Sequence, residues 1–103
     1  MILVIDVGNT NTVVGVYEGK QLLCHWRMKT DKRRTADEYG MFFLTMMKND
    51  GIDNKSVEAV VISSVVPPVM YSLERSVNKY LGLKPIVVGP GVKTGINIKY
   101  ENP

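Results

Sequence analysis

The chain has little of what several classes of protein depend on. It holds one cysteine, Cys24, and one histidine, His25, so neither an internal disulfide nor a local zinc site can form from these residues. No apolar run approaches the roughly 18 residues of a membrane-spanning helix. Met1 leads directly into a strand-like run that ends at Asp6, which does not resemble a signal peptide. We therefore expect a cytoplasmic protein without a membrane partner.

Several common catalytic and nucleotide-binding patterns are also missing. The chain contains no G-x-x-x-x-G-K-[ST] and no G-x-G-x-x-G that opens a helix. Cys24 and His25 are neighbours on a predicted strand, so they point to opposite faces and do not form a nucleophile and base. Ser63 and Ser64 have no base in their sequence context. Their hydroxyls are therefore predicted to bind backbone or ligand.

Positive charge exceeds negative charge only modestly, with a formal net charge of +3 and an isoelectric point near 9.1. Four of the 13 basic residues lie within 29–34, a short segment that contains Asp31 and no aromatic residue. This pattern favours a solvated loop with a mild attraction for phosphate. Direct nucleic-acid binding through Lys32, Arg33 and Arg34 is the alternative, but we expect no nucleic-acid partner.

What the chain does have is a regular succession of strand and helix signals in a composition typical of one soluble domain, 45% hydrophobic and 22% charged. Apolar and β-branched runs predict the strands, and apolar residues at spacings of three and four predict the helices. Strands are predicted at 1–7, 13–17, 21–29, 57–66 and 86–88, and helices between Thr35 and Gly51 and between Pro67 and Gly82.

Both predicted helices carry boundary signals. Thr35-Ala-Asp-Glu38 is a capping box, in which each of the two outer side chains accepts a hydrogen bond from the other residue's backbone N–H. Gly51 suits the left-handed conformation that ends a helix. Pro67-Pro68 fits a first helical turn, and Gly82 fits the end of the second helix.

The order strand, strand, strand, helix, strand, helix, strand predicts an α/β fold with a mixed five-stranded sheet. Short connections make the first three strands an antiparallel meander, and right-handed crossovers set the last two strands parallel to the first. This is the ribonuclease-H-like topology. It brings the polar segment 6–12 and the serines at 63 and 64 to one edge of the sheet, where ligands of open α/β sheets bind.

The polar segment 6–12 is the main candidate site. Asp6 ends a strand that is apolar enough to be buried. Burying a carboxylate costs free energy unless it is paired or binds a metal ion, so Asp6 indicates a functional role. Backbone N–H groups of Gly8 to Thr12, with the hydroxyls of Thr10 and Thr12, could hold a phosphate chain while Asp6 positions Mg²⁺ through water.

A simpler reading is an Asx-type turn, in which Asn9 and Asn11 satisfy local backbone groups. Turn chemistry does not require the charge of Asp6 at the end of a central strand, so the phosphate-binding interpretation is favoured.

Three separated motifs resemble those of the type III pantothenate kinases. They are Asp6-Val-Gly-Asn-Thr10, Ser63-Ser64-Val-Val-Pro67-Pro68 and Thr94-Gly-Ile-Asn-Ile-Lys-Tyr100-Glu-Asn-Pro103. The resemblance implies the acetate-kinase, sugar-kinase, Hsp70 and actin superfamily, whose members pair two ribonuclease-H-like domains and bind ATP between them. It implies ATP-dependent phosphorylation of pantothenate to 4'-phosphopantothenate, the first step of coenzyme A synthesis, by a homodimer that uses Mg²⁺ and a monovalent cation, K⁺ or NH₄⁺.

The same resemblance assigns roles to individual residues. Tyr100 forms a wall of the pantothenate pocket, and Asp6 lies near Mg²⁺, with water between them. The first ATP phosphate loop comprises Asp6, Val7, Gly8, Asn9, Thr10, Asn11, Thr12 and Val13.

The proposed base of the family belongs to a Gly-Ala-Asp-Arg motif that would follow Pro103, so no catalytic base is expected within residues 1–103. The resemblance implies that this chain is the amino-terminal domain of a two-domain kinase, inactive without the second domain and its own phosphate loop. Because members of the family have been assigned as accessory factors for transcription, a non-catalytic nucleotide-binding or regulatory module is the alternative.

Overall fold

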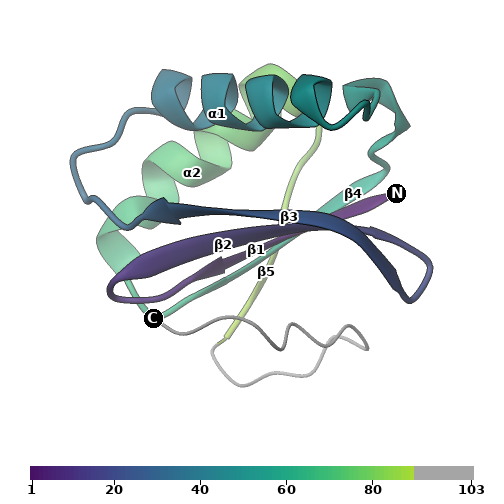
Figure 1. Cartoon of the computed structure of the whole chain (residues 1–103). Helices are drawn as coiled ribbons and strands as arrows, with labels where there is room; N and C mark the ends of the chain where they lie inside the picture. Colours follow the sequence, from purple (N-terminus) through teal and green to yellow (C-terminus); the bar gives the residue numbers. More distant parts are fainter. Residues whose placement is uncertain (90–103) are drawn as a thin grey trace.

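The computed structural model, which describes residues 1–89, contains one sheet with its helices on one side (Figure 1). The tail at 94–100, with Tyr100, lies outside the described residues. The strands are β1 (Ile2–Val7), β2 (Asn11–Glu18), β3 (Gln21–Lys29), β4 (Ala59–Ser64) and β5 (Ile86–Val88), and the helical elements are α1 (Ala36–Asn49), η1 (Asn54–Ser56), η2 (Pro67–Val69), α2 (Met70–Ser76) and η3 (Val77–Leu81).

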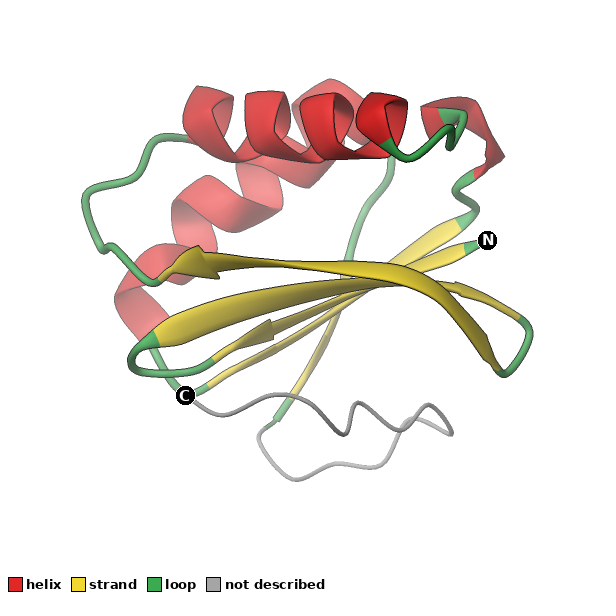
Figure 2. Ribbon diagram, in the orientation of Figure 1, coloured by secondary structure: helices red, strands yellow, loops and turns green. Residues whose placement is uncertain are grey.

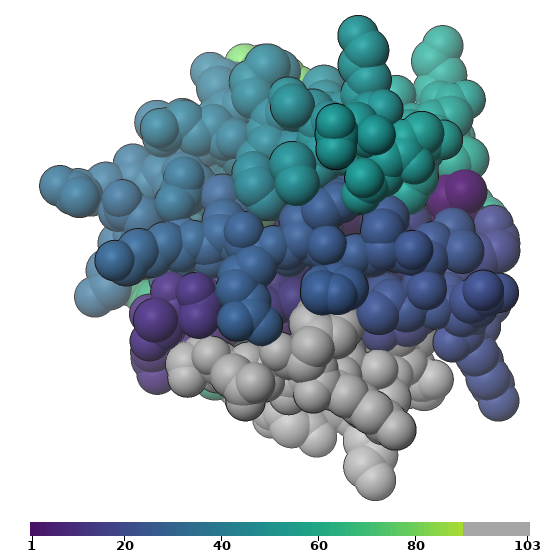
Figure 3. All heavy atoms as spheres, in the orientation of Figure 1, coloured from purple at the N-terminus to yellow at the C-terminus, as the bar shows by residue number. Residues whose placement is uncertain are grey.

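The sheet has the predicted topology. Its five strands lie in the order β3-β2-β1-β4-β5. β1 pairs antiparallel with β2, and β2 with β3, whereas β4 pairs parallel with β1 and with β5. Figure 3 shows the edge strand β3, in blue, crossing the front of the molecule below the teal atoms of α1. The ribonuclease-H-like arrangement expected from the sequence is confirmed.

The hydrophobic core lies between the sheet and the helices, which cover one face of it (Figure 2). Leu3, Ile5 and Val7 alternate along β1 and join this core together with Phe43 of α1 and Leu73 of α2. Full burial of a side chain of this size stabilises the folded state by about 1.5–3 kcal/mol relative to leaving it exposed. Since neighbouring strand residues face opposite ways, Asp6 lies on the face of β1 away from the helices.

The capping box of α1 is present as predicted. The Glu38 N–H donates to the Thr35 hydroxyl at 3.1 Å, and the Thr35 N–H donates to Glu38 Oε1 at 2.7 Å. Gly51 follows the helix with φ of 73°, the left-handed value expected there. Trp26 Nε1 donates to Asp50 Oδ2 at 2.6 Å, which fixes the end of α1 against β3.

The second predicted helix differs from the expectation of one regular element between Pro67 and Gly82. It consists of the 3-10 turn η2, the short α2 and the π-helical η3. No side chain caps its start, the two prolines lack N–H donors, and Val69 N–H donates to Val66 O, three residues back. Gly82, with φ of 67°, ends the segment as predicted.

The close approach of η3 to α1 depends on Gly40, which the sequence did not single out. A Cβ built on Gly40 would overlap the Tyr80 ring. A side chain at position 40 would therefore displace the Tyr80 ring from its place against α1.

The second strand begins earlier than predicted, at Asn11 rather than at Val13. Asn11 and Thr12 pair with Lys29 and Met28 of β3, and Thr12 also pairs with Val7 of β1. Thr12 is thus paired on both sides, whereas Asn11 is paired with β3. The connection between β1 and β2 is therefore only Gly8 to Thr10.

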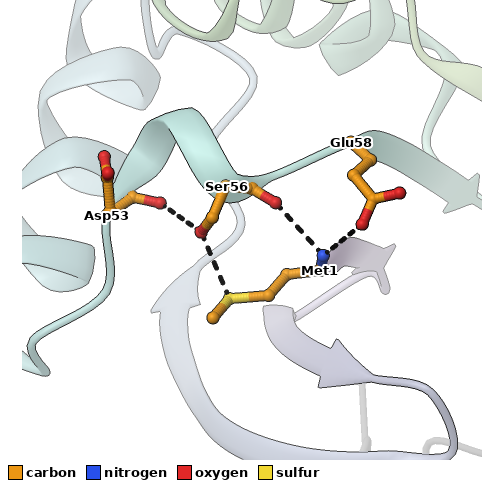
Figure 4. A network of polar contacts seen from close by, with 4 residues as sticks. All are labelled: Met1, Asp53, Ser56 and Glu58. Atoms are coloured by element: carbon orange, nitrogen blue, oxygen red, sulfur yellow. Dashed lines mark hydrogen bonds and ion pairs between the residues drawn. The ribbon is translucent and has the colours of Figure 1, made fainter.

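At the opposite end of β1, the chain start is bound to the segment before β4 (Figure 4). The Met1 ammonium group donates to Ser56 O at 3.1 Å and lies 2.9 Å from Glu58 Oε2. The Ser56 hydroxyl donates to Asp53 O at 2.5 Å and contacts the Met1 sulfur at 3.5 Å. These contacts align the starts of the two central parallel strands.

Candidate functional site

The carboxyl ends of β1 and β4 bring the candidate polar residues together. In the parallel register Asp6 lies beside Ser63, and Val7 lies beside Ser64. Ser63 in turn pairs with Val88 of β5. Asp6 is half-buried and is flanked on its other side by Val13 of β2. The predicted juxtaposition of the polar segment and the two serines is confirmed.

The loop Gly8 to Thr10 closes the β1–β2 hairpin at this end of the sheet. The Gly8 N–H donates to Asn11 O at 2.9 Å. Gly8 is buried, whereas Asn9 and Thr10 are exposed. The two exposed polar residues are thus presented at the tip of a short loop whose base is fixed.

The base of the loop is held by Thr30, which sequence reasoning missed. Its hydroxyl donates to Gly8 O at 2.8 Å and lies 2.9 Å from the Thr12 hydroxyl, and its N–H donates to Thr10 O at 2.9 Å. A threonine just after a strand carries no sequence signal for a binding site. Thr30 reaches the loop only because β3, β2 and β1 lie side by side in the sheet. The end of β3 and the β1–β2 loop lie together at the left in Figure 1.

The Thr12 side chain is 1% exposed and takes part in this hydrogen-bond chain. A hydroxyl carries one proton, and that of Thr30 is given to Gly8 O, so the Thr12 hydroxyl is the donor to Thr30. In this structure the Thr12 proton is therefore engaged with Thr30 rather than directed to solvent.

The two valines of the predicted phosphate segment offer only their backbone at this edge. Val7 is 1% exposed and belongs to the core under the helices, and Val13 is 1% exposed on the opposite face of the sheet. Asn11 is half-buried. Polar side chains at the loop surface therefore come from Asn9, Thr10 and Asn11.

Of the two serines, Ser64 is engaged in a local turn. Its hydroxyl accepts from the Val66 N–H at 2.9 Å and lies 3.3 Å from Val66 O, while the Val65 N–H donates to Val7 O at 3.1 Å. This agrees with the expectation of backbone hydrogen bonding rather than nucleophilic attack. Ser63 is half-buried on the face of the sheet that carries Asp6.

The basic segment directly adjoins the candidate loop through Thr30. Residues 29–34 line a surface hollow of about 510 Å³. Arg34 Nη2 donates to Lys29 O at 2.8 Å, and the Arg34 guanidinium lies 6.0 Å from the centre of the Tyr39 ring. Hydrogen bonds from the backbone and side chain of Arg33 lower the pKa of Asp31. The segment is a folded cationic loop beside Gly8 to Thr10.

Cys24 and His25 lie apart from this site, and their side chains point to opposite faces of β3. Cys24 is half-buried against the core, and His25 is exposed. Burial, with a contribution from the nearby Asp50 carboxylate, raises the pKa of Cys24 to about 11. The thiol is therefore protonated near neutral pH and is a weak nucleophile, in agreement with the prediction against a catalytic pair.

Within residues 1–89 no group of three or more acidic, histidine or cysteine side chains is placed to hold a metal ion. Asp6 is a single half-buried carboxylate with the Ser63 hydroxyl on the adjacent strand. This donor set fits Mg²⁺, which commonly keeps several waters and takes one or two protein carboxylates together with phosphate oxygens. In the same part of the chain, no helix combines the length and apolar character needed to cross a membrane.

Solved structures similar to this one include two kinases and a protein described as RuvC. A ROK hexokinase from Thermus thermophilus matches with a TM-score of 0.64 and 16% identity, over 85% of this chain and 34% of that one. A putative N-acetylglucosamine kinase from Porphyromonas gingivalis matches with a TM-score of 0.62 and 19% identity, over 86% of this chain and 34% of that one. RuvC from Thermus thermophilus matches with a TM-score of 0.56 and 22% identity, over 86% and 61%.

These similarities establish the fold, and this chain spans about a third of the length of either kinase. The amino-acid sequence matches the type III pantothenate kinase family over residues 2–103. Since the match covers nearly the whole sequence, including the polar loop after β1, the chain belongs to the type III pantothenate kinase family.

Proposed function

We propose that this chain is the amino-terminal half of a two-domain kinase that transfers a phosphoryl group from ATP to pantothenate. The observation that carries the proposal is the short polar loop Gly8 to Thr10 at the carboxyl end of β1, beside the half-buried Asp6, in a chain of this family. A carboxylate and a fixed backbone loop at this edge of an open α/β sheet suit a phosphate chain with its metal ion.

In this proposal the segment Asp6 to Val13 binds the ATP phosphates. Backbone N–H groups of the loop and the side chains of Asn9 and Thr10 contact phosphate oxygens, while Thr12 supports the loop through Thr30. Asp6 would hold Mg²⁺, directly or through water, and the ion when bound would neutralise phosphate charge.

The remaining assignments follow the family and not the described residues. Tyr100 contributes to the pantothenate pocket, a K⁺ or NH₄⁺ ion is required beside Mg²⁺, and the full-length protein is a homodimer. A cytoplasmic location is proposed for the same reason.

Phosphoryl transfer needs donors and charges on both sides of the transferring group, held in place before the reaction. One wall of the site leaves the phosphates facing water. We therefore propose that residues 1–103 bind MgATP but do not catalyse transfer without a second domain.

Two measurements test the proposal. In a coupled ADP-release assay with ATP, Mg²⁺, K⁺ and pantothenate, the 103-residue chain is expected to show no pantothenate-dependent turnover. In an amide NMR titration, MgATP is expected to shift the resonances of Gly8 to Asn11. Pantothenate-dependent turnover would overturn the need for a second domain, and loop amides unmoved by MgATP would overturn the phosphate-loop assignment.

A further inference from the structure

We propose that Thr30 is a positioning residue that sets the shape of the phosphate loop from outside the loop itself. This inference rests on the proposed function of Gly8 to Thr10. Thr30 follows β3, and β2 lies between β3 and β1 in the sheet. Its hydroxyl nevertheless reaches Gly8 O at 2.8 Å, and its N–H reaches Thr10 O at 2.9 Å. One residue thus holds both ends of the exposed loop.

The hydrogen bonds form a directed chain. Thr12 O–H donates to Thr30 Oγ1 at 2.9 Å, and Thr30 O–H donates to Gly8 O, because each hydroxyl has one proton to give. Thr12 is 1% exposed, so water does not readily replace Thr30 as its acceptor. The hydrogen bond from Thr12 therefore fixes the orientation of the Thr30 hydroxyl.

Fixing the Gly8 carbonyl also fixes the donor on the other side of the same peptide group. A peptide unit is planar and trans, so the Asn9 N–H points opposite to the Gly8 C=O. With the Gly8 C=O turned toward Thr30, the Asn9 N–H is directed away from Thr30. The hydrogen bond from Thr30 N–H to Thr10 O orients the peptide group between Thr10 and Asn11 in the same manner.

Loop N–H groups that already point outward need less reorganisation to bind an anion. Thr30 therefore acts on phosphate affinity through the loop backbone, without contacting the ligand. Threonine also suits the position because its β-branched side chain restricts χ1, which limits the directions that the hydroxyl can take.

The test compares Thr30→Val, which keeps the shape and removes the hydroxyl, with Thr30→Ser, which keeps the hydroxyl. Thr45→Val, at an exposed position of α1, is the matched control. MgATP dissociation constants are measured by amide NMR titration at a temperature where circular dichroism shows every variant folded. We expect Thr30→Val to weaken MgATP binding about tenfold, and Thr30→Ser and Thr45→Val to stay within about twofold of the parent chain.

The ligand-free spectra supply a second readout. Thr30→Val is expected to shift the Asn9 amide and speed its hydrogen exchange, with Thr30→Ser restoring both. A merely structural role would lower the unfolding midpoint and leave the dissociation constant of the folded protein unchanged, which would overturn the inference. If the parent chain itself does not respond to MgATP at the loop, the proposed function fails, a result distinct from equal binding by the parent and Thr30→Val.

Discussion

The two ends of β1 are both fixed by polar contacts, but of different kinds. At the start of the strand, the charged Met1 ammonium group meets Glu58, whose side chain is 78% exposed. At the other end, neutral hydroxyls of Thr12 and Thr30 hold the Gly8 carbonyl, and Thr12 is 1% exposed. The side-chain contact at one end is therefore a solvated ion pair, and at the other end it is a buried hydrogen-bond chain.

This difference indicates which end tolerates change. Water can solvate both partners of an exposed ion pair when it breaks, so such pairs contribute little to stability. A buried hydroxyl or carbonyl that loses its partner cannot turn to solvent, and it keeps the full desolvation cost. Loss of a side-chain contact is thus expected to cost more at the end of β1 where the candidate phosphate loop lies.

The largest contrast between the ends should come from removing a carboxylate at each. Asp6→Asn is expected to reduce MgATP affinity by more than about tenfold, because it removes the charge proposed to hold Mg²⁺. The measurement is an NMR or fluorescence titration with ATP in Mg²⁺ and again in excess EDTA. In EDTA the parent chain and Asp6→Asn should bind alike.

Glu58→Gln is the matched control, since it removes a carboxylate at the far end of the same pair of strands. Its MgATP affinity should equal that of the parent chain. Equal, Mg²⁺-dependent binding by Asp6→Asn and the parent would contradict the assigned role of Asp6 and favour a nucleotide-binding module of another kind.

A smaller effect is expected from Thr12→Val, which removes the buried donor to Thr30 and leaves the bond from Thr30 to Gly8. The loss should lower the free energy of unfolding by about 1 kcal/mol, the usual net value of a buried hydrogen bond. Urea denaturation measures it, with Thr45→Val on the exposed surface as control. A change no larger than that of the control would show that the buried chain does not stabilise the loop end.

The smallest effect is expected from Glu58→Gln on stability. Breaking its ion pair with the Met1 ammonium group should change the free energy of unfolding by less than roughly 0.5 kcal/mol, and still less as salt is added. Urea denaturation at two salt concentrations measures this change. A salt-insensitive loss as large as that of Thr12→Val would contradict the contrast between the two ends.

Much of the fold followed from periodicity and boundary residues. The limits of β3 and β5, the capping box at Thr35, the left-handed Gly51 and the end of the second helix at Gly82 agree with prediction. These features depend on residues near one another in the sequence. The π-helical end of the second helix was not predicted, and there Tyr80 packs against Gly40 of α1, a contact between residues far apart in the sequence.

The candidate site was predictable only in part. Asp6 and the loop stood out because polar residues interrupt apolar runs, and the register with Ser63 followed from parallel topology. Thr30 did not stand out, since its contacts arise from lateral pairing within the meander. The early start of β2 at Asn11 was missed because Asn11 and Thr12 are polar and carry no strand signal. Their place in the sheet also depends on lateral pairing.

The meander has a consequence for the order of folding. The contacts that shape the candidate phosphate loop all lie between Gly8 and Thr30, so closing them costs little chain entropy. Ser63 reaches Asp6 only after a far longer segment, including α1, has closed. We expect the Thr30 amide to gain protection before those of β4 in a pulsed hydrogen-exchange experiment, with the Asp6 side of the candidate site completed last.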